Sequence, residues 1–170
     1  MTFNDRQARL TILSLAIGAF AIGVSEFASM GLLPYYAADL GVSEPFAGHA
    51  VSAYAVGVVI GAPVLAVLGA FLNRKLLLVL LVAFYGVANL VSALAGSIEM
   101  LIAARFLSGL PHGAFLGVSM LFAAELSPGR SSATAVAKVL TGLTIANVIG
   151  VPAAGAIGQV FGWRWGFAIV

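Results

Sequence analysis

The chain alternates between long apolar runs and short polar breaks. Five runs lack Asp, Glu, Lys and Arg altogether, and they cover residues 10–25, 45–73, 76–98, 106–124 and 139–163. A helix needs roughly 20 mostly apolar residues to cross a bilayer core of about 30 Å. The pattern therefore predicts an all-α, polytopic membrane protein in which each run forms one transmembrane helix.

Proline, glycine and charged residues mark the ends of these helices. We expect five complete spans and the start of a sixth, at residues 10–36, 46–72, 76–95, 100–124, 133–161 and 166–170. The last apolar run stops at Val170, too early to cross a membrane. We therefore expect residues 1–170 to form an incomplete N-terminal transmembrane domain, and a natural protein with five spans is the alternative.

Composition supports a membrane protein and excludes several other classes. Hydrophobic residues make up 62% of the chain and charged residues 8%, whereas soluble domains are about half apolar and about a quarter charged. The net charge of +2 is too small and too scattered for a nucleic-acid-binding surface. The sequence has no cysteine, no metal-binding motif and no Gly-rich nucleotide-binding loop. We therefore expect neither an enzyme nor a cofactor or metal site.

Basic residues near the span ends are distributed unevenly. Six of them fall on the side of the N-terminus: Arg6, Arg9, Arg74, Lys75, Arg130 and Lys138. Only Arg164 falls on the other side. Because Lys and Arg accumulate at the cytoplasmic ends of spans, this asymmetry predicts a cytoplasmic N-terminus.

Three ionisable residues inside the predicted spans, Glu26, Arg105 and His112, are candidates for function, because a charge within a membrane is costly. From the helical rise, Glu26 in the first span lies about 14 Å and Arg105 in the fourth about 9 Å below the same membrane face. We expect the two side chains to be close, directly or through water. Glu26 would then carry a proton or contact a solute, or it is a protonated acid that packs helices together. Arg105 would be its partner, or would only hold helices together through backbone carbonyls.

Further polar and small residues occupy the fourth span. His112 follows Arg105 by seven residues and so lies on the same helix face, which we expect to border a water-filled cavity. Alternatively, His112 caps a carbonyl group that Pro111 leaves without its hydrogen bond. Gly109 and Gly113 stand four residues apart, a spacing that lets two helix backbones approach closely.

The fifth span combines one polar side chain with several residues that weaken a helix. Asn147 needs a hydrogen-bonding partner at this depth, either the solute or a neighbouring helix. Gly150, Pro152 and Gly155 are expected to make the second half of the span bendable and closely packed.

Three segments resemble sequence motifs of the major facilitator superfamily. Residues 105–114, RFLSGLPHGA, resemble its span-4 motif, an Arg followed four residues later by Gly. Residues 150–155, GVPAAG, resemble the span-5 motif of its proton antiporters, with Val151 between the usual Gly and Pro. Residues 69–75 stand where the family has its cytoplasmic loop motif between spans 2 and 3, with Asn73 in place of an Asp. The loop-motif residues are Gly69, Asn73, Arg74 and Lys75.

Other segments resemble one branch of this family, the arabinose-efflux-type permeases among the drug/proton antiporters. They include Glu26-Phe27, residues 54–57 (YAVG) and residues 108–115 (SGLPHGAF), and the resemblance covers nearly the whole chain. It implies twelve helices in two six-helix halves, with alternating access around a central cavity. Residues 1–170 would be most of the N-terminal half, with spans 1, 2, 4 and 5 at the cavity and span 3 outside it.

The resemblance implies secondary active transport across a bacterial inner membrane: proton-coupled efflux of a small organic solute such as a sugar or drug. The partners would be the lipid bilayer, the solute, protons and the C-terminal half of the transporter. Arg105 matches the motif Arg to which the family assigns a part in proton transfer, and Glu26 matches a span-1 acidic position. A uniporter or symporter of the same fold is an alternative, as is a truncated membrane partner that transports nothing.

Overall fold

The computed structural model describes residues 5–127 and 131–170, and the regular secondary structure of these residues is entirely helical. The elements in chain order are α1 (Asp5–Gly31), α2 (Leu33–Asp39), α3 (Glu44–Ala47), α4 (His49–Gly69), α5 (Arg74–Ala93), α6 (Ile98–Leu126), α7 (Ser131–Ile145), the π-helix η1 (Ala146–Gly150), α8 (Val151–Phe161) and α9 (Trp163–Ala168). The expected all-α fold is confirmed. Arg130, counted above among the basic residues, lies outside the described residues.

Five segments are long and apolar enough to cross a membrane, as the hydrophobic pattern predicts. They are Asp5–Gly31, Glu44–Gly69, Arg74–Ala93, Ile98–Leu126 and Ser131–Phe161. After the fifth, Gly162 adopts a positive φ of 97° and turns the chain back, and α9 begins a sixth helix. Glycine suits this position because a left-handed backbone is disfavoured for residues with a side chain.

The first span ends earlier than we expected from the sequence. α1 ends at Gly31, and α2 begins at Leu33 as a separate helix instead of continuing to Tyr36. Pro34 lies in the first turn of α2, where its missing N–H is harmless because the first amides of a helix have no intrahelical partner. A hydropathy pattern contains no information on backbone hydrogen bonding, so the apolar run did not predict this break.

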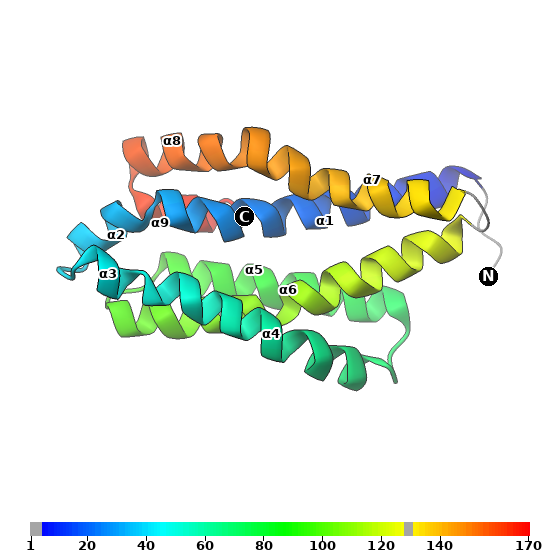
Figure 1. The fold of residues 1–170 in the computed structure, drawn as a ribbon, viewed down its shortest axis with the longest axis horizontal. Coiled ribbons are helices and arrows are strands. Elements are labelled where there is room, and N and C mark those ends of the chain that lie inside the picture. Colours follow the sequence, from blue (N-terminus) through cyan, green and yellow to red (C-terminus); the bar gives the residue numbers. More distant parts are fainter. Residues whose placement is uncertain (1–4, 128–130) are drawn as a thin grey trace.

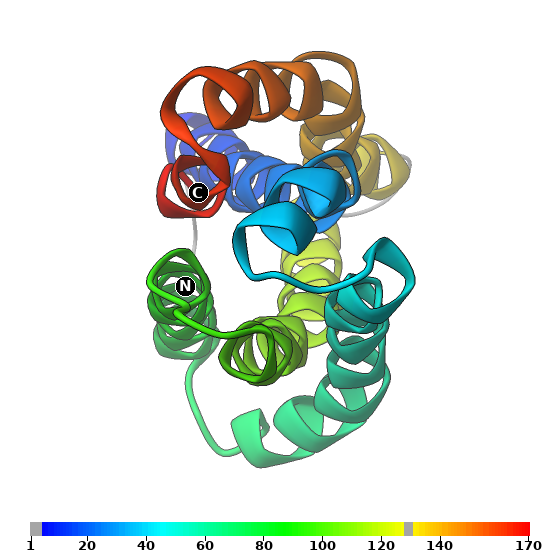
Figure 2. The ribbon, with the colours of Figure 1, turned by 90° about the vertical axis from the view of Figure 1, so that its left-hand side faces the viewer.

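The long helices run roughly along the long axis of the molecule (Figure 1). One end of the bundle, here called the N-terminal end, contains the start of α1 and the turn between α4 and α5; the other, here called the Asp39 end, contains α2, α3 and the start of α9 (Figure 1). Seen along the axis, α1 lies between α7 and α8 on one side and α4, α5 and α6 on the other (Figure 2). The two groups also contact each other directly, where α6 packs on α7.

Glycines bring α4 and α6 into backbone contact. A Cβ atom on Gly57 would lie 2.2 Å from the carbonyl oxygen of Phe106, and one on Gly109 would lie 2.2 Å from the carbonyl oxygen of Tyr54. Gly113 faces α4 as well, where its Cβ would lie 2.6 Å from that of Ala62. No side chain fits at these distances, so the glycines set the spacing that brings Tyr54 close to the polar face of α6.

Candidate functional site

Arg105 on α6 is the centre of a polar cluster in the interior of the bundle, where it is only 1% exposed. Its Nη1 atom donates to Ser25 Oγ at 3.0 Å and lies 3.4 Å from both Asn89 Oδ1 and Ser108 Oγ. Its Nη2 atom donates to the carbonyl oxygen of Ser25 at 3.3 Å. The guanidinium thus joins α1, α5 and α6. Arg105 therefore holds helices together mainly through side chains, and not through backbone carbonyls alone as the alternative supposed.

Two aromatic rings lie close to the guanidinium. The Cζ atom of Arg105 is 4.2 Å from the ring centroid of Tyr54 on α4 and 5.1 Å from that of Phe167 on α9. A cation near a ring face is stabilised by the negative potential of that face, and more strongly when water is absent. The Arg105 Nε atom has no hydrogen-bond partner among the described residues. Four of the five spans and the start of the sixth helix therefore meet at this one charge.

Glu26 lies beside this cluster but not in it. The ion pairs of the described residues join Arg74 to Glu125 and Arg164 to Asp39, so the direct pairing of Glu26 with Arg105 that we allowed for is not formed. The reason is helix rotation: Ser25, fully buried, points at Arg105, and successive residues differ in direction by about 100°. The half-buried Glu26 carboxylate therefore stays without a partner among the described residues, next in sequence to the residue that holds Arg105.

His112 belongs to a second group of hydrogen bonds that touches the first. Its Nδ1 atom is 2.8 Å from the Tyr54 hydroxyl, which is 3.4 Å from the Tyr85 hydroxyl, and Tyr85 donates to the carbonyl oxygen of Ile22 at 3.1 Å. His112 thus binds a tyrosine rather than a carbonyl freed by Pro111. Because the Tyr54 ring lies under Arg105, the same residue joins both groups.

The polar face of α6 is more enclosed than we expected. Arg105, His112 and Ser119 are 1%, 8% and 0% exposed, so this face packs mainly against neighbouring helices instead of bordering an open water-filled space. His112 keeps the most exposure of the three. Two cavities lie elsewhere: one of about 390 Å³ between α1 and α7, and one of about 520 Å³ among α4, α5 and α6 near the N-terminal end.

Asn147 lies apart from the Arg105 cluster, on the exposed side of η1. Its Nδ2 atom donates to the carbonyl oxygen of Leu143 at 3.0 Å. Among the described residues its partner is therefore the preceding turn of its own helix, whereas we expected a neighbouring helix or the solute. An asparagine can satisfy its amide in this way because residues four apart are adjacent on a helix.

The residues expected to bend the fifth span lie where α7 becomes irregular. The π-helix η1 separates α7 from α8, and Pro152 lies in the first turn of α8. Single π-helical turns inside long helices are rare and often occur at functional sites. Gly150 packs on α1, because a Cβ atom added to Gly150 would lie 2.3 Å from Val24. A Cβ atom added to Gly155 would have no neighbouring atom within 4 Å.

The loop-motif residues form the tight turn between α4 and α5. Asn73 caps α5, since its Oδ1 atom accepts a hydrogen bond from the Leu76 amide at 2.8 Å, as asparagine commonly does at a helix start. Gly69 is buried at the end of α4. Arg74 pairs with Glu125 on α6, a partner that we did not foresee, while Lys75 is exposed.

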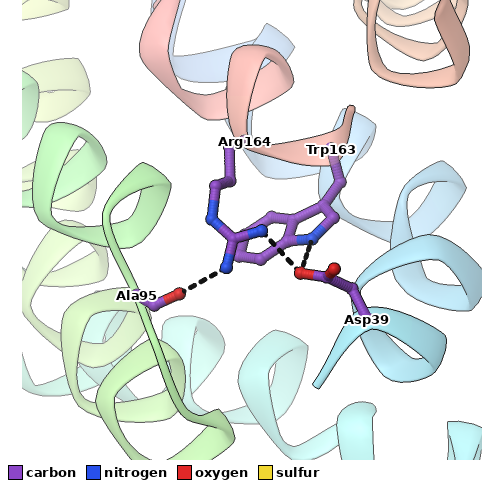
Figure 3. A network of polar contacts seen from close by, with 4 residues as sticks. All are labelled: Asp39, Ala95, Trp163 and Arg164. Carbon is purple, nitrogen blue, oxygen red and sulfur yellow. Dashed lines mark hydrogen bonds and ion pairs between the residues drawn. The ribbon is translucent and has the colours of Figure 1, made fainter. Parts of the chain in front are cut away.

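A third polar group ties the Asp39 end together (Figure 3). Asp39 accepts from Arg164 Nη1 at 2.5 Å and from Trp163 Nε1 at 3.0 Å, and Arg164 Nη2 donates to the carbonyl oxygen of Ala95 at 3.0 Å (Figure 3). These bonds, from Arg164 first and then from Trp163, hold the pKa of Asp39 below its usual value. The ring of the buried Trp163 contacts Tyr36 and Phe167 edge-on, so this network adjoins the ring beside Arg105.

The sequence did not single out several residues of the buried site as candidates for function. They are Ser25, Tyr54, Tyr85, Asn89, Ser108 and Phe167. One signal was available: Tyr85 and Asn89 lie four residues apart in an otherwise apolar span, and Asn89 donates to the Tyr85 carbonyl oxygen. A polar pair on one helix face indicates a polar neighbour. Span 3 is thus more than an outer helix, because it supplies an acceptor to Arg105.

The sequence profile of the Major Facilitator Superfamily matches residues 15–170. The chain belongs to this superfamily. It is therefore a multi-pass membrane protein of a transporter family, and the family is not one of enzymes.

Individual relatives carry transporter names. The chain is 46% identical to the inner membrane transport protein YdhP of Escherichia coli K12, over 92% of the chain and 40% of the relative. It is 42% identical to the putative transporter AraJ of the same strain, over 94% and 40%. It is 37% identical to a chloramphenicol resistance protein of Streptomyces lividans, over 94% and 42%. The chain spans about two fifths of the length of these relatives.

Proposed function

We propose that the chain is the N-terminal part of a proton-coupled exporter of a small organic solute. One observation carries the proposal: Arg105 is a fully buried cation without an ion-pair partner among the described residues, and Glu26 is a partly buried acid without one. An unpaired charge in a membrane is costly and is kept where it has a function. A proton on Glu26 would remove its charge beside Arg105, so binding and release of that proton would change the electrostatics of the site.

The other candidate residues have subordinate roles in this proposal. His112 on α6 and Asn147 on η1 would line the solute cavity only in the complete transporter, because neither of the two cavities described above includes them. Gly109 and Gly113 hold α4 against α6, and the region of Gly150, Pro152 and Gly155 is where the fifth span bends during alternating access.

Export of a drug-like solute is favoured by the relative named as a chloramphenicol resistance protein, and a sugar is the other candidate. We place the protein in a bacterial inner membrane, as the name of YdhP suggests, with the N-terminal end in the cytoplasm. Within residues 5–127 and 131–170, the basic residues that we assign to this end are Arg6, Arg9, Arg74, Lys75 and Lys138. The bilayer, the solute, protons and the C-terminal half of the transporter are the partners.

The test is chloramphenicol efflux from cells that express the protein from its own gene, with and without a protonophore. We expect Glu26→Gln to abolish protonophore-sensitive efflux, because Gln keeps the shape of the side chain but cannot release a proton. Glu99→Gln is the matched control, since Glu99 is exposed in the first turn of α6. Efflux that survives Glu26→Gln and ignores the protonophore would indicate a uniporter instead.

A further inference from the structure

A groove of about 390 Å³ follows the seam between α1 and α7, in the half of the bundle next to the N-terminal end (Figure 1). The two helices touch along its floor, where a Cβ atom added to Gly142 would overlap the carbonyl oxygen of Ala16. Leu13 and Ile17 on one wall are 55% and 60% exposed, and Ile145 on the other is 44% exposed. The groove therefore opens to the surroundings of the bundle.

The walls of this groove are apolar along most of their length. On α1 they include Ile12 and Phe20 besides the two exposed side chains. Thr141 on α7 also lines the groove, but its hydroxyl donates to the Ala137 carbonyl oxygen at 2.9 Å and is thus satisfied within its own helix. A surface of this kind offers few hydrogen bonds to water and favours an apolar occupant.

Two basic side chains stand at the mouth of the groove. Arg9 on α1 and Lys138 on α7 are the lining residues nearest the N-terminal end of each helix, and both are exposed. Neither has an ion-pair or hydrogen-bond partner among the described residues, and Asp5, one turn before Arg9, forms no ion pair with it. Residues 1–4 and 128–130 contain no Asp or Glu. The mouth therefore carries two positive charges with which no acid of the chain pairs.

The length of the groove matches one leaflet of a membrane. Arg9 and Phe20, at the two ends of its lining on α1, are separated by about 16 Å along the helix axis. One leaflet supplies about 15 Å of a bilayer core that is roughly 30 Å thick. A free phosphate would leave the apolar walls uncovered, and a zwitterionic lipid would bring a positive charge to the two cations. An anionic lipid complements both the mouth and the walls.

We propose that this groove binds an anionic phospholipid, with its phosphate between Arg9 and Lys138 and one acyl chain along Leu13, Ile17 and Ile145. Basic pockets between helices at the cytoplasmic side attract anionic headgroups, because that leaflet is negatively charged. The bound lipid holds α7 against α1 on the N-terminal side of η1, where the fifth span is proposed to bend. The inference rests on the orientation given under the proposed function, but on neither proton coupling nor export.

The test measures the binding of single phospholipids to the complete transporter, expressed from its own gene and purified in detergent, by native mass spectrometry. The probes are dioleoyl-phosphatidylglycerol and, for comparison, zwitterionic dioleoyl-phosphatidylcholine. We expect phosphatidylglycerol to bind more tightly. Arg9→Gln/Lys138→Gln should lower its affinity about 30-fold, since each basic residue near an anionic headgroup contributes a factor of about five. Lys75→Gln is the control, because Lys75 is exposed at the same end but does not line the groove.

A matched pair of variants tests the apolar part of the groove. Thr141 and Thr144 are both exposed on α7 and both bond to a carbonyl oxygen of their own helix, but only Thr141 lines the groove. A phenyl ring at residue 141 would occupy the space of the acyl chain. Thr141→Phe should therefore weaken the binding of phosphatidylglycerol, and Thr144→Phe should not. Thermal unfolding without added lipid shows whether each variant is folded.

Three results would overturn the proposal. The first is equal affinity of the wild type for the two lipids. The second is an unchanged affinity for phosphatidylglycerol in Arg9→Gln/Lys138→Gln, which would mean that another segment of the transporter covers the groove or that the lipid binds elsewhere. The third is equally tight binding of glycerol phosphate, which has the headgroup charge but no acyl chain. None of these measurements involves transport, so a failure of the proposed export or proton coupling leaves the lipid site standing.

Discussion

Arg105 and Arg164 both hold helices together, and they do so by different means. Arg105 is buried, and its partners are hydroxyls, an amide, a backbone carbonyl and two aromatic rings. Arg164 is 41% exposed in its side chain, and it pairs with a carboxylate, Asp39, that is 47% exposed. The buried cation thus has only neutral partners, while the exposed cation has the counter-charge.

The difference separates an ion pair that joins helices from a buried charge to which we assign a function in the proposal above. An ion pair at a water-accessible end neutralises itself, and its contribution to stability is modest because water screens it. Neutral dipoles around a buried cation stabilise it without cancelling its charge, so its field still acts on a nearby acid. In the mechanism that we propose, the site around Arg105 therefore responds to the protonation of Glu26, whereas the Asp39 network joins helices.

The largest effect should come from disrupting the backbone contact between α4 and α6 that positions Tyr54. In Gly109→Leu the new Cβ would overlap the Tyr54 carbonyl oxygen, so α4 must move away and the ring leaves Arg105. We expect the free energy of unfolding to fall by about 3 kcal/mol or more. Gly155→Leu is the control, because its Cβ would meet no atom within 4 Å. Tryptophan fluorescence during thermal unfolding in detergent measures both, and equal midpoints would contradict the close packing of α4 on α6.

The next largest effect should come from removing an acceptor and leaving the buried charge. Asn89→Leu deprives Arg105 Nη1 of one partner and Ser25 of its hydrogen-bond acceptor. We expect a loss of about 1–3 kcal/mol in unfolding free energy, the usual effect of an unsatisfied buried polar group. Asn147→Leu, at an exposed asparagine that bonds only to its own helix, should change it by less than about 0.5 kcal/mol.

A double variant shows whether the charge of Arg105 causes the loss of stability expected in Asn89→Leu. Asn89→Leu/Arg105→Met removes the cation together with its acceptor, and replacing buried polar groups by apolar ones is often neutral. We expect it to recover part of the stability lost in Asn89→Leu but not transport. A double variant less stable than Asn89→Leu alone would mean that the contacts of Arg105 outweigh its desolvation.

The exposed arginine should matter less for stability. Arg164→Met removes the ion pair with Asp39 and the bond to the Ala95 carbonyl, and we expect a loss of about 1 kcal/mol or less because the pair is open to water. The loss should shrink as salt is raised, since salt screens exposed charges. Chemical unfolding at low and high ionic strength checks both points, and a loss as large as that of Asn89→Leu would remove the contrast between the two arginines.

The smallest effect should be a pH dependence at the Asp39 end. The pKa of Asp39 is lowered in the folded protein by Arg164 and Trp163, so its contribution is complete above the pKa of the unfolded chain and is lost as the pH falls through the folded-state pKa. We expect Asp39→Asn to be slightly less stable than the wild type at neutral pH and equally stable in strong acid. Thermal midpoints measured across this range test it, and a difference that grows in acid would contradict the assigned direction.

The sequence by itself determined the number of spans and the class of fold. These depend on local composition, because each apolar run must be long enough to cross a bilayer whatever its neighbours are. It also singled out Glu26, Arg105 and His112 as residues worth attention, since polar groups in such runs are costly wherever they point. The break at Gly31 was missed because it depends on backbone geometry rather than on hydropathy.

Only the tertiary structure decided which residues meet. A rotation of α1 by one residue would exchange Ser25 for Glu26 at the guanidinium of Arg105, and nothing local to the first span sets that rotation. It is set by close packing between helices, as the glycines of α4 and α6 set the position of Tyr54. The sequence therefore indicated that a charge is buried, and the packing of four other helices, α1, α4, α5 and α9, determined that its partners are neutral.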